Sequence, residues 1–213
     1  MWHPVKQNSE DACPCCGLNW MELRAGKVTG STIARIMANE GKAFGDPAHR
    51  LAVDIAVFEL GGQVTSDSYS NGHMERGIEQ EPIARQKYSE AYFVDVADGG
   101  FYDNGQTGCS PDGLIGEDGL VQFKCVINSQ QYHCVETNKY DSAWKWQLIF
   151  ELKESGRKYT DYVSYCATFP RLYKQLFVYR IKADSVKDEY SRIDTRLKEF
   201  RKLVEAKKEH IRR

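Results

Sequence analysis

The middle of the chain contains the segment that most limits how this protein can fold. Two β-rich runs, 109–115 and 120–126, flank the sequence Gly-Glu-Asp-Gly at 116–119. Glycine and acidic residues at such a junction are typical of a tight β-hairpin. Because side chains alternate along a strand, Gln122 and Lys124 face the same side of the second run. The sequence therefore predicts an antiparallel pair of strands with polar side chains gathered on one face.

The register of this hairpin decides where Asp112 points. If Ile115 pairs with Gly119 around a three-residue loop, Asp112 lies opposite Gln122 and shares one face with it and with Lys124. A register shifted by one residue turns the aspartate to the other face, unless a bulge intervenes. We predict the first register, since burying an unpaired carboxylate against apolar residues is costly.

A carboxylate, an amide and an ammonium on one face come close to what a phosphodiester-cleaving site requires. Such a site uses two carboxylates to hold Mg²⁺ at about 2.1 Å, with open positions for water and phosphate. A neighbouring lysine orients the attacking water and offsets charge in the transition state. Asp112 and Lys124 fit these roles, whereas Gln122 supplies only a neutral oxygen.

At these residues the sequence resembles the PD-(D/E)XK nucleases, in the form found in phage lambda-type exonucleases, the YqaJ-like viral recombinase family. Three further segments resemble the family's motifs and follow in the same order. They are Leu-Arg-Ala-Gly-Lys-Val-Thr-Gly-Ser at 23–31, the Arg-Gly…Glu helix motif at 76–82 and the glutamine-bearing helix at 146–148. The resemblance covers roughly residues 19–155. It implies an α/β fold, a PD-(D/E)XK nuclease core with a central mixed β-sheet flanked by α-helices.

The resemblance assigns a role to each polar residue of the hairpin. It implies that Asp112 is a metal-binding aspartate and that Gln122 occupies the position of the metal-binding glutamate. The backbone carbonyl of Phe123 is implied as a further metal ligand, and Lys124 as the catalytic lysine. Glu81 is implied to assist the metal or its water from the adjacent helix. The implied cofactor is Mg²⁺, for which Mn²⁺ can substitute.

The resemblance also implies a pocket for the terminal 5′-phosphate, formed by Arg24, Ser31 and Ser110. Arginine makes paired hydrogen bonds to phosphate. Ser31 lies at the predicted start of a helix, where anions are favoured. Gln147 is implied to hydrogen-bond the substrate backbone near the scissile phosphate.

Three positions depart from the family pattern, Gln122, Val126 and Ile149, and only the first affects the chemistry. Losing one negative charge weakens Mg²⁺ binding and the electrostatics around its bound water. Two accounts are open. Gln122 is either an engineered replacement of glutamate that inactivates the enzyme, or a natural residue in a chain that binds DNA or cleaves slowly. We favour the first account, because the rest of the site is intact and an amide is nearly isosteric with a carboxylate.

The function implied by the resemblance is a Mg²⁺-dependent exonuclease. It would digest linear double-stranded DNA from 5′ to 3′ and leave a 3′ single strand for recombination by annealing. The family's toroidal homotrimer is implied as the assembly. The implied partners are double-stranded DNA ends and a single-strand annealing protein, in the bacterial host cytoplasm of a phage or prophage-encoded system. The alternative is a non-catalytic DNA-end-binding protein of the same fold.

The charge balance limits where DNA can bind. The 213 residues include 29 Lys+Arg and 30 Asp+Glu, which argues against a uniformly basic nucleic-acid binder. A local basic channel at Arg24 and Lys124 stays compatible with this balance.

No apolar run approaches the roughly 20 residues of a membrane-spanning helix, so no membrane partner is expected. We expect one nuclease domain over 1–213, with an irregular arm at 1–18 and a closing helix at 184–213.

Apolar periodicity predicts the remaining elements. Helices are expected at 19–25, 29–41, 47–60, 72–92 and 142–153, and strands at 92–96, 159–169 and 175–181. Trp144 and Trp146 are interpreted as core or interface aromatics, and His73 as a surface or capping residue. The basic cluster at 198–213 alternates with acids and is interpreted as a solvated helical face.

The seven cysteines are an odd number, and no secretion signal is visible, which favours a reducing compartment over a disulfide framework. Cys13, Cys15 and Cys16 form the one cluster, but a zinc or iron–sulfur site needs four ligands. The cluster offers at most three, and no CxxC or HxxxH pair follows downstream. We interpret these residues as reduced thiols, with an iron–sulfur nuclease and a structural zinc module as alternatives.

Overall fold

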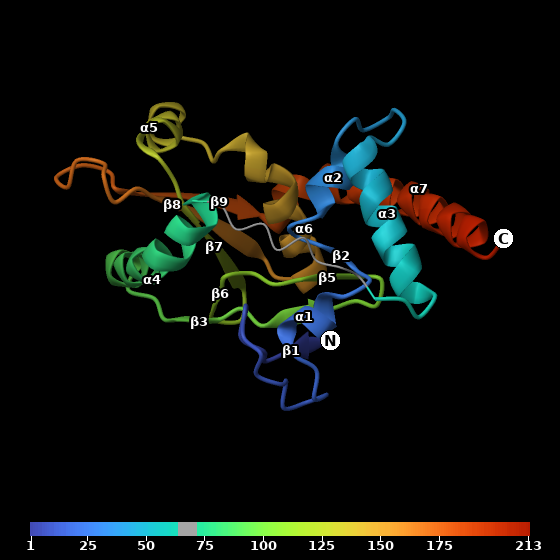
Figure 1. Ribbon diagram of the computed structural model, residues 1–213. Coiled ribbons are helices and arrows are strands. Elements are labelled where there is room, and N and C mark those ends of the chain that lie inside the picture. The colour runs from blue at the N-terminus through green and yellow to red at the C-terminus, as the bar shows by residue number, and fades with distance from the viewer. Residues whose placement is uncertain (64–71) are drawn as a thin grey trace.

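The computed structural model describes residues 1–63 and 72–213, except for the side chains of 72–75. Two β-sheets form the centre of the described chain, and helices are packed around them (Figure 1). The mixed sheet and its flanking helices confirm the α/β fold predicted from the sequence. His73 was predicted to be a surface or capping residue, and its side chain is among those that the structure does not describe.

In the described chain the larger sheet has five strands in the order β3-β6-β7-β8-β9. Their bounds are Val96–Asp98 (β3), Gly113–Ile115 (β6), Gly119–Cys125 (β7), Tyr159–Tyr165 (β8) and Leu176–Lys182 (β9). Strands β7 and β8 are parallel, whereas the other neighbours are antiparallel, so the sheet is mixed. A parallel pair needs a long crossover, which the chain between 126 and 158 provides.

The smaller sheet has the strand order β1-β4-β5-β2. Its strands are Trp2–His3 (β1), Phe101–Asp103 (β4), Thr107–Cys109 (β5) and Val28–Thr29 (β2). The run at 109–115, predicted as one strand, is divided between the two sheets as β5 and β6. The break falls at Pro111, which has no N–H to donate to a strand ladder. Asp112 therefore lies at the junction between the two sheets.

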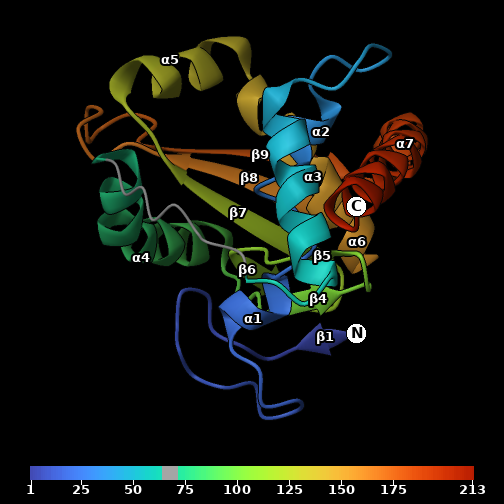
Figure 2. The same cartoon turned by 45° about the vertical axis from the view of Figure 1, so that its right-hand side comes forward.

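Seven α-helices and two short 3₁₀ helices flank the sheets within the described residues. They are Trp20–Arg24 (α1), Ile33–Met37 (α2), Asp46–Glu59 (α3), Gly72–Tyr92 (α4), Asn128–Thr137 (α5), Ser142–Trp144 (η1), Lys145–Ser155 (α6), Ala183–Val186 (η2) and Lys187–Ile211 (α7). Helix α4 covers one face of the larger sheet, where Tyr88 packs with Val121 and Phe123 of β7. Helices α2, α3, α6 and α7 form the larger core on the other face, together with Leu120 (Figure 2).

Alternation along β7 explains why polar residues lie on the α6 side. Val121 and Phe123 point towards α4, so Gln122 and Lys124 point the opposite way. The predicted register is confirmed, since Ile115 pairs with Gly119. The hairpin is therefore built as the sequence indicates.

Charged side chains attach the closing helix α7 to the rest of the chain. Glu59 at the end of α3 accepts hydrogen bonds from Arg201 and from Lys208, the latter at 2.8 Å. Arg196 donates to the backbone carbonyl of Ile36 at 2.9 Å. Arg201 and Lys208, which belong to the basic cluster at 198–213, therefore attach α7 to α3. Among the described helices, none is long and apolar enough to cross a membrane.

Three expectations about secondary structure differ from the fold. The strand predicted at 92–96 is wrong, because α4 continues to Tyr92 and the chain turns at Phe93, whose φ is 53°. Helix α5 was not predicted; its residues are mainly polar, and only Gln131 and Cys134 are buried. The arm expected to be irregular contains β1, which pairs with β4.

Candidate active site

Asp112 is held rigidly at the start of β6. Its Oδ2 accepts a hydrogen bond from the backbone N–H of Phe123 at 2.7 Å, across the hairpin. Its backbone carbonyl accepts a hydrogen bond from Arg85 of α4 at 2.5 Å. Gly99 lies so close that an added Cβ would be 1.6 Å from the Pro111 carbonyl oxygen. Burial raises the pKa of Asp112, although Lys124 and the Phe123 N–H act in the opposite direction.

Glu81 brings a second carboxylate to the site from α4. Burial raises the pKa of Glu81 to about 7, and the negative charge of Asp112 adds to the rise. Arg85, one turn further along α4, lies 3.7 Å from Glu81 and only partly offsets this effect. Two carboxylates that raise each other's energy in this way form a place where a cation is favoured.

Gln122 and Lys124 lie side by side on β7. Lys124 Nζ donates to Gln122 Oε1 at 3.1 Å, and it also lies 4.4 Å from the centre of the Trp144 ring. Gln122 is completely buried, and its Nε2 donates to Glu151 Oε2 at 2.5 Å. Because the Lys124 ammonium can only donate, its hydrogen bond assigns the amide oxygen of Gln122 to the Lys124 side and the amide nitrogen to Glu151.

Glu151 of α6 is a site residue that sequence analysis missed. Its carboxylate is 1% exposed and accepts hydrogen bonds from Gln122 and, at 2.9 Å, from Gln147. Gly30 leaves room for it, since an added Cβ would be 2.2 Å from Glu151 Oε1. Burial raises the pKa of Glu151 to about 8, while Lys124 acts to lower it. The available signal was its position four residues after Gln147, on the same face of a helix.

Arg24 forms a second group of contacts at the end of α1. Its Nη2 donates to Ser31 Oγ at 2.8 Å and lies 3.4 Å from Thr29 Oγ1. The guanidinium carbon lies 4.2 Å from the centre of the Trp20 ring, and Trp20 Nε1 donates to Ser110 Oγ at 2.7 Å. Arg24, Ser31 and Ser110 are therefore connected through Trp20, as expected for residues of one pocket.

Glu151 links the polar residues of the hairpin to the contacts around Arg24. Burial lowers the pKa of Arg24, and the charge of Glu151 partly restores it. Among the described residues, no carboxylate lies within 4.0 Å of the Arg24 guanidinium. This cation therefore keeps donor capacity for an anion. A cavity of about 400 Å³ opens beside it, between α1 and α3, and its lining includes the cations Lys27 and Arg35 and the acids Glu22 and Asp54.

Gln147 lies at the site, but its amide nitrogen is bonded to Glu151. Trp144 and Trp146 are partly buried against the larger core, as expected for core aromatics. The hairpin register predicted from the sequence is confirmed. The structure also links Arg24, Ser31 and Ser110 through Trp20. Glu151, Arg85 and Trp20 emerge as neighbours of these residues only from the fold.

The donor set on the hairpin suits a hard divalent cation. Asp112, Glu81, the Gln122 amide oxygen and the Phe123 carbonyl offer oxygen atoms only, as Mg²⁺ prefers. The charge of Asp112 raises the pKa of Glu81, so these two carboxyl groups interact electrostatically.

Comparisons with known proteins agree with this geometry. Residues 19–168 match the family described as the YqaJ-like viral recombinase domain. An alkaline exonuclease from Laribacter hongkongensis, LHK-Exo, is similar at TM-score 0.77 and 29% identity, over 91% of this chain and 95% of that one. The structure of LHK-Exo in complex with dAMP is similar at TM-score 0.74 and 30% identity, over 88% of this chain and 92% of that one.

A phage related exonuclease from Haemophilus somnus 129PT shares the fold at TM-score 0.63 and 12% identity, over 84% of this chain and 93% of that one. A comparison with curated proteins finds no match. The similarity therefore rests on the family match and on solved structures.

Proposed function

The chain belongs to the YqaJ-like viral recombinase family, and we propose that it is an active, Mg²⁺-dependent exonuclease on linear double-stranded DNA. It would digest from 5′ to 3′ and leave a 3′ single strand for recombination by annealing. The observation that carries this proposal is the hairpin register, which gathers Asp112, Gln122 and Lys124 beside Glu81. The alkaline exonuclease activity named for LHK-Exo, which is about as long as this chain, supports the same reaction class.

Asp112, the Gln122 amide oxygen, the Phe123 carbonyl and Glu81 would hold the metal. When bound, Mg²⁺ supplies positive charge to the scissile phosphate and lowers the pKa of an attacking water. Mn²⁺, which accepts the same oxygen donors, would substitute. Arg85 supports this ligand set by fixing the backbone of Asp112 and by approaching Glu81.

Lys124 would orient the attacking water and offset the charge that develops on the phosphate. Its position is fixed by the Gln122 oxygen on one side and by the Trp144 ring on the other. A lysine held this way loses less conformational entropy when the substrate binds. The amine is therefore preorganised for the reaction.

Arg24, Ser31 and Ser110 would bind the terminal 5′-phosphate. Arg24 is placed for this role by Trp20 and Ser31 and has no carboxylate partner within 4.0 Å among the described residues. Binding the terminal phosphate beside the metal site would explain why digestion starts at the 5′ end. Ordering of the DNA end at a fixed distance from Lys124 is the physical basis of this preference.

The sequence alone favours an inactivating replacement at Gln122, but its environment in the fold leads us to propose the other account, a natural residue in an active chain. An engineered Glu-to-Gln replacement would change position 122 alone. Here the Gln122 amide has a hydrogen-bond acceptor in Glu151, and Gly30 leaves the space that the Glu151 side chain needs. Glu151 accepts a hydrogen bond from the Gln122 amide nitrogen, and the Gln122 oxygen accepts one from Lys124. A glutamate at position 122 would instead place two buried carboxyl groups in contact, and both could not ionise without a large cost.

The second candidate is a DNA-end-binding protein without nuclease activity, and the neutral side chain of Gln122 is the observation that favours it. In this account the amide is an inactivating substitution. The two candidates bind the same DNA ends and differ only in hydrolysis, so a cleavage assay distinguishes them.

We further propose that residues 1–213 act as one nuclease domain and assemble as a homotrimeric ring around DNA. The net charge of −1 fits an enclosed channel, because positive charge is needed only near Arg24 and Lys124. A single-strand annealing protein would receive the 3′ strand. Light scattering of the purified chain tests the trimer, whose mass is three times 24.4 kDa.

The function is tested with linear duplex DNA labelled at either the 5′ or the 3′ end, in the presence of Mg²⁺. We expect early release of the 5′ label, loss of activity with EDTA and loss of activity in Lys124→Ala. Lys139→Ala, at an exposed position just beyond α5, is the matched control. Early release of the 3′ label would disprove the polarity, and DNA binding without hydrolysis would support the end-binding candidate.

A further inference from the structure

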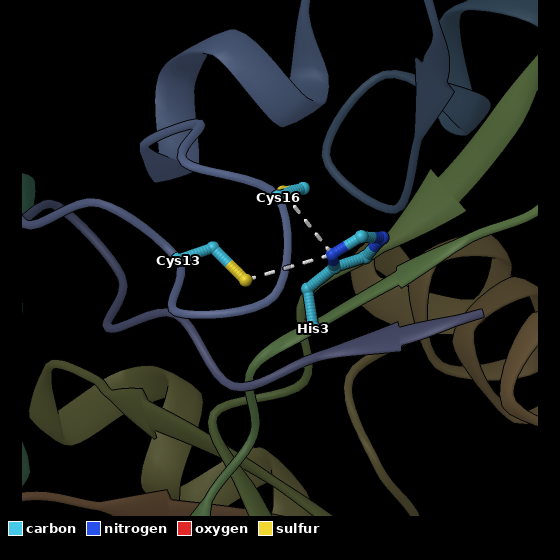
Figure 3. A group of neighbouring side chains, drawn as sticks. All are labelled: His3, Cys13 and Cys16. Carbon is cyan, nitrogen blue, oxygen red and sulfur yellow. Dashed lines mark hydrogen bonds between the residues drawn. The ribbon is translucent and has the colours of Figure 1, made fainter.

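His3, Cys13 and Cys16 meet in the N-terminal arm (Figure 3). In the part of the chain that the structure describes, they are the one group of three or more His, Cys, Asp or Glu residues whose ligand atoms all lie within 4.8 Å. The sequence interpretation counted only the thiols and overlooked His3, which β1 brings to them from ten residues upstream of Cys13.

We propose that His3, Cys13, Cys15 and Cys16 form a structural zinc site that attaches the N-terminal arm to the nuclease fold. The proposal is independent of the nuclease function. It concerns a metal different from the Mg²⁺ of the hairpin and a soft donor set of thiolates and one imidazole, which Zn²⁺ prefers.

Distances between the ligand atoms support this assignment. Cys13 Sγ lies 3.6 Å from His3 Nδ1, and Cys16 Sγ lies 3.5 Å from the same nitrogen. In a tetrahedral zinc site with Zn–S near 2.3 Å and Zn–N near 2.0 Å, sulfur and nitrogen are about 3.6 Å apart. The side chains are therefore already spaced like ligands on one metal ion.

Hydrogen bonding alone accounts poorly for this arrangement. A neutral imidazole nitrogen that accepts hydrogen bonds has one lone pair, yet two thiols converge on Nδ1 of His3. His3 is only 6% exposed and Cys13 only 1% exposed, so water contributes little to their solvation. A shared cation satisfies both sulfurs and the nitrogen at once.

The local backbone is shaped for a metal-binding turn. Cys13 and Cys16 have the C-x-x-C spacing, and the turn closes at Gly17 with φ 76°, where its N–H donates to the Cys13 carbonyl at 2.8 Å. The Cys13 N–H in turn donates to the Leu18 carbonyl at 2.8 Å. Such a closed turn presents two sulfurs on one side.

Cys15 is the neighbouring thiol that would complete the set. Its exposed side chain lies outside the group of three whose ligand atoms converge, so it would have to turn towards Cys13 and Cys16 when the metal binds. Three cysteines and one histidine complete the four-coordinate set of a structural zinc site. The site then has no open position for a substrate.

The site has a structural reason to exist. Val5, Cys13, Trp20, Leu23 and Phe101 form a small core separate from the two larger ones. An apolar cluster of this size contributes little to the free energy of unfolding by itself. In small structural units a bound metal ion often supplies the missing stability.

The arm also contacts the loop that carries Asp112. Gln7 Nε2 donates to the carbonyls of Ser110 and Pro111 at 3.0 and 2.8 Å. A metal that holds His3 and Cys13 together fixes the segment containing Gln7 between them. Zinc would therefore position the start of β6 without taking part in catalysis.

The test uses the full chain, purified under reducing conditions and supplied with Zn²⁺, with metal content measured by mass spectrometry. We expect one zinc per chain, its loss in the Cys13→Ser/Cys16→Ser variant and its retention in Cys166→Ser. Cys166 is the matched control, a buried thiol bonded to Asn128 far along the chain. Less than 0.2 zinc per chain in the unaltered protein, or equal zinc in all three proteins, would overturn the proposal.

Co²⁺ substitution gives a second measurement that needs no variant to fold independently. The unaltered chain should show the visible bands of tetrahedral Co²⁺ and thiolate-to-cobalt charge transfer, and Cys15→Ser should lose about one third of the charge-transfer intensity. Octahedral Co²⁺ spectra, or stoichiometric iron with broad visible absorbance, would contradict a zinc site. Unchanged intensity in Cys15→Ser would remove Cys15 from the ligand set and refute the four-ligand form of the proposal.

Discussion

The side-chain amide of Gln122 on β7 donates a 2.5 Å hydrogen bond to the buried carboxylate of Glu151 on α6. This contact holds the amide nitrogen of Gln122, while the Gln122 oxygen accepts a hydrogen bond from Lys124. The acid Glu151 on α6 is therefore the hydrogen-bond partner of the Gln122 amide on β7. The predictions below follow from this relationship and from the contacts around it.

Glu151→Gln should reduce DNA cleavage about 10- to 100-fold, which is the usual effect of removing a partner that orients a metal ligand. The new amide no longer fixes Gln122, so its oxygen is not held towards Lys124. The concentration of Mg²⁺ that gives half-maximal rate should rise at the same time. Glu136→Gln, on the exposed face of α5, is the control and should leave both quantities unchanged. A variant that keeps full rate and metal dependence would show that Glu151 does not position the amide.

Arg24→Ala should reduce cleavage of 5′-phosphorylated ends about 10- to 100-fold, as expected when a charge-assisted hydrogen bond of about 1.5–3 kcal/mol is removed. Ends with a 5′-hydroxyl should be affected much less, so the preference for phosphate should disappear. Rates on both substrates, compared with those of the exposed Arg50→Ala variant, provide the measurement. An equal loss on both kinds of end would assign Arg24 to folding instead of phosphate binding.

The metal-free protein should lose stability as the pH rises from about 5 to 8. Burial raises the pKa of Glu151 from 4.5 to about 8 and that of Glu81 from 4.5 to about 7. Over this window the folded state keeps protons that the unfolded state has released, so the free energy of unfolding falls with increasing pH. Urea denaturation at several pH values in EDTA measures this slope. Glu151→Gln should flatten it, and a slope equal to that of the unaltered chain would contradict the raised pKa.

Asp161→Ala should destabilise the fold by about 1–3 kcal/mol, because it leaves the buried Tyr88 hydroxyl without its acceptor, while the half-exposed Arg180 is still solvated by water. Asp161 is fully buried on β8, where it accepts two hydrogen bonds from Arg180 at 2.7 and 2.8 Å and one from Tyr88 at 2.5 Å. Asp118→Ala removes an exposed pair with Lys158 and should cost at most about 1 kcal/mol. Chemical denaturation of both variants measures the difference, and similar losses would show that the Asp161 network adds no specific stability.

The hairpin could be predicted from the sequence because its information is local. Turn residues at 116–119 and strict alternation in β7 determine the register, and the register determines which side chains share a face. The helices with clear apolar periodicity, such as α3, were also predictable. Helix α5 was not, since its few buried residues are Gln131 and Cys134 and give no apolar pattern.

The rest of the site depends on contacts between distant segments. Glu151 enters it only because α6 packs against β7, and an acid on a helix usually indicates a solvated face. His3 joins Cys13 and Cys16 only because β1 pairs with β4. Spacing along the sequence cannot indicate such encounters, because they require the tertiary fold.

The most direct test of the central claim compares the unaltered chain with Gln122→Glu on 5′-phosphorylated linear duplex DNA and Mg²⁺. The account predicts that the unaltered chain hydrolyses the DNA. It also predicts that Gln122→Glu is no faster, because the new carboxyl group would lie against the buried carboxyl group of Glu151. Binding without hydrolysis by the unaltered chain, together with cleavage by Gln122→Glu, would contradict it and identify Gln122 as an inactivating residue.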